Sequence, residues 1–100
     1  MNDNNQSTLF KLNFDLSFDE AIRDLRSEKN RKMRKGSQNY WVLYALFCGD
    51  VIDDYDNKPR DNEDKEIHNI KTRISDLTNK YNIKIEREFE KNYKKYWIAR

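Results

Sequence analysis

The feature that most constrains the fold is an apolar run of nine residues, Tyr40 to Cys48, in a chain of which 38% is charged. Ser37 ahead of the run is a favourable helix N-cap, and Gly49 behind it is typical of a helix C-terminus. A run of this length between cap signals favours a helix buried on most of its surface over a strand. It is shorter than the roughly 20 apolar residues that span a bilayer. We therefore predict that it forms the centre of the one modest core that 100 residues allow.

The segment before this helix contains three different patterns. Residues 1–8 are polar and unpatterned, which predicts a disordered tail. From 9 to 16 apolar and polar residues alternate, which predicts a half-buried strand. Ser17 and Glu20 have the spacing of a helix capping box. An apolar stripe at helical spacing follows, formed by Phe18, Ala21, Ile22 and Leu25. Beyond it the chain to Lys35 is expected to continue as a solvated basic helix or to fray.

After the central helix the pattern changes to a short strand, a loop, a helix and a hairpin. Val51 and Ile52 suit a brief strand, and 53–61 reads as an acidic loop. Asp61 or Asn62 is expected to cap a helix that ends near Tyr81. Its apolar stripe consists of Ile67, Ile70, Ile74, Leu77 and Tyr81. Asn82 is expected to take the left-handed cap conformation. Alternation from 83 onwards, with a polar turn at 90–92, predicts a β-hairpin that ends at Ile98.

Charge is unevenly distributed along the chain, although the net charge is only +2. Residues 23–35 hold seven Lys/Arg and two acids, 50–66 hold eight acids and three Lys/Arg, and 67–100 hold nine Lys/Arg and four acids. Two basic blocks therefore flank an acidic one, and we expect the basic blocks to contact an anionic partner.

The C-terminal part of the sequence is similar to a known family. The helix segment Ile70-Lys71-Thr72-Arg73-Ile74-Ser75-Asp76-Leu77 and the downstream Tyr96-Trp97-Ile98 resemble the small winged helix-turn-helix domains of phages and bacterial mobile elements. The similarity covers residues 40–98, mainly 70–98. It implies a winged-helix-like α+β fold with about three helices, a C-terminal β-hairpin and, in this chain, an added N-terminal strand. Residues 9–100 would form one domain, with 9–36 as an extension. The resemblance implies DNA binding, with the helix that ends near Tyr81 as the reading element.

Three groups of residues are candidates for contact with nucleic acid. On the helix predicted over 62–81, a rotation of 100° per residue places an outward face opposite Ile74. This face holds Lys65, His68, Asn69, Thr72, Arg73, Asp76, Asn79 and Lys80, of which we take all but Asp76 and Asn79 as candidate contacts. The hairpin turn adds Lys91, Asn92, Lys94 and Lys95, which would grip phosphate as a wing. The basic arm adds Arg31, Lys32, Arg34 and Lys35. An ordinary solvated helix face and lysines that protect a strand edge are the alternatives.

The sequence gives little support for catalysis or metal binding. His68 is the only histidine, and Cys48 lies in an apolar segment where a thiol stays protonated. The acidic segment from Asp50 to Asp64 lacks the glycine of a calcium-binding loop, and Lys58 and Arg60 interrupt it. We expect a protein that is not an enzyme, holds no metal or cofactor, and does not enter a membrane. A bacterial cytoplasm is the expected location, since the N-terminus lacks the layout of a signal peptide.

Two functions from different classes remain open. The first is a DNA-binding protein of a phage or mobile element that acts in regulation, excision or replication, with duplex DNA preferred over single strands. The second is a phage-type inhibitor that docks on a host protein or protein–RNA complex, such as a CRISPR or restriction nuclease or a replication enzyme. The family has a short helix ahead of its reading helix, whereas residues 53–64 here are acidic, which favours the second. The Arg73-Ile74-Ser75-Asp76-Leu77 segment and the lysines at the hairpin turn favour the first. The segments 9–16 and 23–35 could also support a homodimer.

Overall fold

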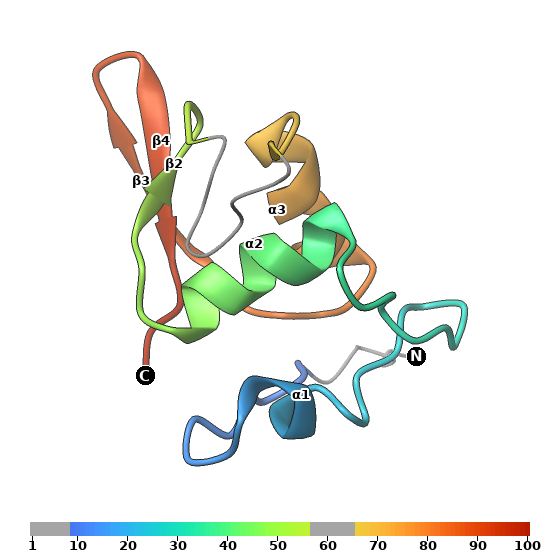
Figure 1. Cartoon of the computed structure of the whole chain (residues 1–100). Helices are drawn as coiled ribbons and strands as arrows, with labels where there is room; N and C mark the ends of the chain where they lie inside the picture. The colour runs from blue at the N-terminus through green and yellow to red at the C-terminus, as the bar shows by residue number, and fades with distance from the viewer. Residues whose placement is uncertain (1–8, 57–65) are drawn as a thin grey trace, which may run out of the picture.

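The structure is a computed structural model that describes residues 9–56 and 66–100. Its fold combines helices with an antiparallel sheet (Figure 1). The elements in chain order are α1 (Phe18–Ala21), α2 (Gln38–Phe47), β2 (Ile52–Asp53), α3 (Ile70–Asn79), β3 (Glu86–Glu90) and β4 (Tyr93–Trp97). The α+β class with three helices and a C-terminal hairpin is confirmed. None of these helices has the length and apolar character needed to cross a bilayer.

Helix α2 occupies the centre of the core, as the apolar run predicts. The Ser37 hydroxyl accepts the Tyr40 N–H at 3.2 Å, and Gly49 ends the helix with φ +97°. Among the described residues, the side chains with no exposed surface are Val42, Leu43, Ala45, Leu46 and, on α3, Leu77. At about 25 cal/mol per Å² of apolar surface, this burial is the main stabilising contribution of both helices.

Helix α3 packs on α2, but it begins later than the sequence pattern predicts. The predicted start at Asp61 or Asn62 is wrong, since 66–69 are not helical and α3 begins at Ile70. Asn69 is the reason. Its backbone is left-handed (φ 59°), and its side-chain oxygen accepts the Thr72 N–H, so it caps a helix rather than continuing one. Residues 61–65 lie outside the described part of the chain. Asn82 takes the expected left-handed conformation (φ 57°).

The sheet has the strand order β2-β4-β3, with β4 in the centre. Arg87 and Ile52 both lie opposite Tyr96, on either side of it. The hairpin turn at 91–92 is confirmed, but β3 begins at Glu86 rather than at 83. Ile83 and Ile85 are nonetheless buried, so the alternation there reflects burial in irregular backbone.

The strand predicted over 9–16 is wrong, because this segment has no strand pairing. It runs beside the core instead, where the Phe10 N–H donates to the Asn82 carbonyl at 2.8 Å. Phe10, Leu12 and Phe14 pack against the core, whereas Leu16 is exposed. Period-two alternation therefore predicted that Phe10, Leu12 and Phe14 face the core, but it was wrong for Leu16 and for the strand, which also needs a partner edge.

The segment that follows 9–16 is also less helical than its stripe predicts. The capping box of Ser17 and Glu20 is confirmed, yet α1 has only four residues. Leu25 is 1% exposed although it lies beyond the helix. The apolar stripe therefore predicted burial correctly and helix length incorrectly.

Residues 26–35, which we call the basic loop, are neither a solvated helix nor a frayed one. An isolated bridge joins Arg26 to Lys32, and the Ser27 N–H donates to the Arg31 carbonyl at 2.8 Å. Asn30 turns the chain with φ 59°, and Met33 is buried beneath it at 8% exposure. The burial of Met33 and the turn hydrogen bonds together hold this segment in a folded loop.

Candidate nucleic-acid interface

The hairpin separates its charges by face. Side chains directly opposite each other in an antiparallel pair share a face, so the register assigns every residue of β3 and β4 to one side. The side that carries the buried Tyr96 also carries Arg87, Phe89 and Lys94. The other side carries Glu86, Glu88, Glu90, Tyr93, Lys95 and Trp97. One face of the hairpin is therefore cationic and the other acidic.

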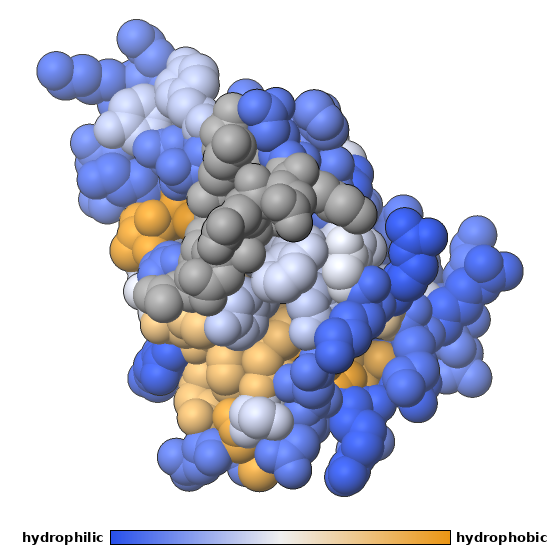
Figure 2. Space-filling view, viewed as in Figure 1, coloured by the Kyte–Doolittle hydropathy of each residue, from blue (hydrophilic) through white to orange (hydrophobic). Residues whose placement is uncertain are grey.

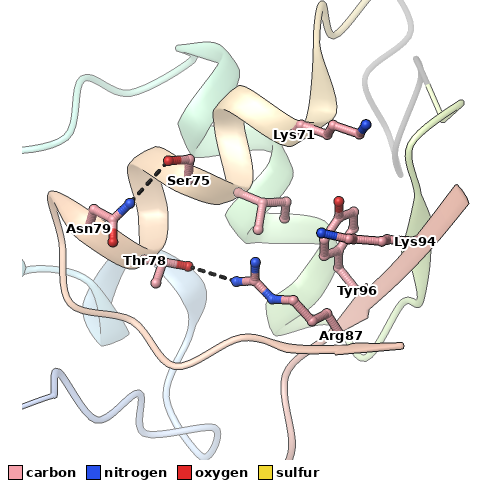
Figure 3. A pocket seen from close by; sticks show the side chains of 8 residues that line it. Lys71, Ser75, Thr78, Asn79, Arg87, Lys94 and Tyr96 are labelled. Atoms are coloured by element: carbon pink, nitrogen blue, oxygen red, sulfur yellow. Dashed lines mark hydrogen bonds between the residues drawn. The ribbon is translucent and has the colours of Figure 1, made fainter. Parts of the chain in front are cut away.

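The cationic face borders α3, and a groove of about 260 Å³ lies between them (Figure 3). We call it the hairpin groove. Its lining consists of Lys71, Ile74, Ser75, Thr78 and Asn79 from α3, and Arg87, Lys94 and Tyr96 from the sheet. Three cations, three hydroxyls and an amide thus line the groove, and no carboxylate of the described residues does. Such a surface is suited to an anion that accepts several hydrogen bonds.

The arginine of the groove is held in place by its neighbours. Arg87 Nη2 donates to Thr78 Oγ1 at 3.5 Å, and its Cζ lies 5.8 Å from the centre of the Tyr96 ring. On α3, Asn79 Nδ2 donates to Ser75 Oγ at 3.1 Å. Figure 3 shows Lys71 and Lys94 reaching toward the same opening from opposite walls. Their ammonium groups pair with no carboxylate within 4 Å among the described residues.

One carboxylate near the groove, that of Asp54, accepts two hydrogen bonds from β4. The Tyr96 hydroxyl donates to Asp54 Oδ1 at 2.7 Å, and the Lys94 N–H donates to Oδ2 at 3.0 Å. Burial acts to raise the pKa of the Asp54 carboxyl. These hydrogen bonds and the charges of Lys71 and Lys94 outweigh burial and hold the pKa below its ordinary value. Burial, followed by the bond to Asp54, raises the pKa of Tyr96 well above 10. Asp54 therefore ties the turn after β2 to β4.

The sequence predicts an outward face on a helix over 62–81, and the structure places only some of those residues on an exposed side of α3. Thr72 and Arg73 are half-buried, and Arg73 Nη2 pairs with Asp76 at 3.6 Å on the flank that meets α2. Asn39 of α2 donates to the same carboxylate at 3.3 Å. Lys80 is exposed and also pairs with Asp76, at 3.6 Å. The prediction that Arg73 projects outward is wrong, since its ion pair faces the helix interface.

The remaining predicted residues of this group precede the helix. His68 is exposed, and its N–H donates to Gln38 of α2 at 3.0 Å. Asn69 is exposed and forms the N-cap of α3. Lys65 lies outside the described residues. Burial raises the pKa of the Tyr81 hydroxyl at the other end of α3, with a further contribution from Asp76.

The predicted wing residues separate into three positions. Lys91 and Asn92 form the exposed turn, as predicted. Lys94 lies in the hairpin groove. Lys95 lies on the acidic face, 3.9 Å from Glu90 and directly opposite Glu88. The structure therefore brings Lys94 together with α3 and directs Lys95 away from it.

The four residues of the predicted basic arm also lie in two different places. Arg31, Lys32 and Arg34 line a second hollow of about 490 Å³ beside the C-terminal end of α3. Lys35 lies outside it and pairs with Asp19 at 3.5 Å. Figure 2 shows hydrophilic residues gathered over the basic loop and over the end of the hairpin.

The sequence reasoning missed five residues of the hairpin groove: Lys71, Ser75, Thr78, Asn79 as a contact, and Arg87. A signal for one of them was present. Arg87 continues the alternation of the buried Ile83 and Ile85, which assigns it to the core side of the hairpin. The α3 residues could not be assigned to this groove without the position of the hairpin.

Other kinds of site find no support in the described part of the chain. No three His, Cys, Asp or Glu side chains gather there in a way that could hold a metal ion. Comparison of the chain with protein-family models, curated proteins and solved structures finds no match. The candidate interface consequently depends on its own geometry and charge.

Proposed function

We propose that this protein binds duplex DNA through α3 and the hairpin groove. The observation that carries the proposal is the convergence of Lys71, Arg87 and Lys94, from α3 and the hairpin, on a groove that no carboxylate between 9 and 56 or between 66 and 100 lines. Phosphate contacts of this kind supply most of the affinity of DNA-binding proteins. The neighbouring hydroxyl and amide groups of α3 can donate to phosphate or to base edges.

The arrangement of the elements supports the same proposal. Helix, short strand, helix and hairpin follow one another, and β4 pairs with both β2 and β3. This order resembles a winged helix, in which α3 would lie in the major groove and the hairpin would be the wing. The short helix that the family has ahead of α3 would fall near 57–65, outside the described residues. Regulation, excision or replication in a phage or mobile element is the setting that the resemblance suggests.

The face of α3 away from the core is suited to a DNA groove. A rotation of 100° per residue places Thr72 and Asn79 opposite the buried Ile74 and Leu77. A helix with side chains is about 10–12 Å across, close to the roughly 12 Å width of the major groove. We therefore expect Asn79 to approach base edges while the hairpin groove holds a phosphate.

Two adjacent lysines provide a matched test. Lys94→Gln removes a cation from the groove, whereas Lys95→Gln removes one from the acidic face. Binding to a labelled duplex is measured by fluorescence anisotropy from about 50 to 200 mM salt. Lys94→Gln should weaken binding and reduce the slope of log K against log salt by about 0.9, the value of one phosphate contact. Lys95→Gln should leave the slope unchanged. Equal effects of both substitutions, or no binding by the wild type at 50 mM salt, would refute the proposal.

A second candidate function is supported by the acidic face of the hairpin. Glu86, Glu88 and Glu90 line one side of β3, which is an edge strand. This face would repel DNA, but it can dock on a basic surface of a host protein, as expected for an inhibitor. Failure to bind DNA, together with charge-dependent capture of a host protein that Glu88→Gln abolishes, would favour this function.

A further inference from the structure

The second hollow has the charge of an anion-binding surface. We call it the loop hollow. Ten residues line it: Ser27, Glu28, Lys29, Arg31, Lys32, Arg34, Ser37, Asn39, Lys80 and Tyr81. Five of these side chains are cationic and one is a carboxylate. Because like charges repel, so many cations around one hollow favour an anionic partner.

Most of these cations form no ion pair within the part of the chain that the structure describes. Lys80 pairs with Asp76, but Lys29, Arg31, Lys32 and Arg34 form no ion pair with any described carboxylate. All four are exposed. Their charges are therefore available to a partner.

The loop that carries these charges is folded and anchored. The Glu28 N–H donates to the Lys80 carbonyl at 2.8 Å, which joins the loop to the end of α3. Arg26 Nη1 donates to the carbonyls of Arg23 and Leu25 at 2.8 and 2.9 Å. Because these bonds and the buried Met33 fix the backbone, binding would order less of the chain than a flexible arm would require.

The two cationic surfaces lie on opposite flanks of α3. Lys71 and Ser75 lie on the flank that borders the hairpin groove. Lys80 borders the loop hollow, and Asn39, which bonds to Asp76, lines the same hollow. Figure 1 shows α3 between the hairpin on the left and the basic loop on the right. The outward-facing Asn79 lies between the two flanks.

From this arrangement we infer that the cations of the loop hollow, Lys29, Arg31, Lys32 and Arg34, bind the phosphates of the second DNA strand, across the major groove from the strand held in the hairpin groove. The inference rests on the proposed function. A helix in the major groove has a phosphate backbone on each side, and this chain places on each side of α3 cations that pair with no described carboxylate. One strand alone would offer only one of these two backbones.

The test compares two double substitutions that each remove two charges from the same basic block. Arg31→Gln/Arg34→Gln removes two cations of the loop hollow. Arg23→Gln/Lys35→Gln is the control, since these residues line a different hollow beside α1. Each variant and the wild type are titrated by anisotropy against a labelled duplex and one of its single strands, at several salt concentrations. Circular dichroism and Tm confirm that each variant is folded.

The loop variant should reduce the duplex salt slope by about two units and weaken duplex binding roughly 10- to 100-fold near 0.1 M salt. The control should keep the wild-type slope, and the loop substitution should have little effect on single-strand binding. An unchanged duplex slope in the loop variant, an equal loss in the control, or an equal loss on single strands would overturn the inference while leaving the proposed function intact. No binding by the wild type would refute both.

Discussion

The hydrogen bond between Tyr96 and Asp54 allows a quantitative test of how the hairpin is held. Tyr96→Phe removes a hydroxyl that donates to a carboxylate at 2.7 Å and belongs to a ring that is only 2% exposed. A hydrogen bond to a charged group contributes about 1.5–3 kcal/mol. Asp54 keeps the Lys94 N–H and is half-buried, so water can replace part of the loss. We therefore expect the free energy of unfolding to fall by about 1.5 kcal/mol at pH 7.

The same substitution should have an effect that depends on pH in a defined direction. Because the folded pKa of Asp54 is lowered, its contribution is fully present above the unfolded value of about 3.9 and is lost as the pH falls through the folded pKa. A protonated carboxyl accepts only a neutral hydrogen bond, which contributes about 0.5–1.5 kcal/mol. The difference between the wild type and Tyr96→Phe should therefore shrink in acid.

Urea unfolding followed by tryptophan fluorescence at pH 7 and at a series of pH values below the unfolded pKa of about 3.9 measures both effects. At pH 7 the midpoint of Tyr96→Phe should shift down by roughly 1 M urea. In an Asp54→Asn background, which mimics the neutral carboxyl at every pH, Tyr96→Phe should have a smaller effect that does not vary with pH. A loss below about 0.5 kcal/mol at pH 7, or a loss that stays constant while the wild-type Asp54 carboxyl becomes protonated in acid, would show that this bond does not hold β2 to β4 as described.

Further predictions concern α3 and its surroundings. Leu77→Ala should lower the free energy of unfolding by about 2–5 kcal/mol, since Leu77 is fully buried between α3 and the core; a loss under 1 kcal/mol in urea unfolding would contradict this packing. Asn69→Ala should cost about 1–2 kcal/mol, while Asn69→Gly should cost less because glycine accepts the left-handed backbone; the reverse order would contradict the cap. Burial, followed by the bond to Asp19, raises the pKa of Tyr40 to about 12, so ultraviolet titration of Tyr40→Phe should lack one high-pH ionisation; loss of a tyrosine that titrates near 10 would contradict the contact.

The parts of the fold that could be predicted from the sequence are those with local signals. Ser37 and Gly49 bracket α2, and six of its ten residues are buried, as its apolar run predicts. The alternation around Lys91 and Asn92 likewise determines a hairpin without any distant contact. Such elements are specified by their own residues.

Other parts of the fold depend on contacts between distant segments, which the local sequence pattern does not determine. Alternation over 9–16 fits a strand, but whether a sheet edge is free to pair is a property of the whole fold. Ile67 continues the stripe of α3, so periodicity alone extends the helix past Asn69. The hairpin groove combines Lys71 with Arg87 and Lys94, which are distant in sequence, and no single-segment pattern joins them.

The most direct test of the central claim is an NMR titration of the ¹⁵N-labelled protein with a duplex oligonucleotide at about 50 mM salt. The proposed binding mode predicts that the shifted amides cluster on α3 from Lys71 to Asn79, at Arg87 and Lys94, and on the basic loop. It also predicts little change at Glu86 and Glu88 on the acidic face. Shifts confined to that face, or an unchanged spectrum at saturating duplex, would contradict DNA binding by α3 and the hairpin groove.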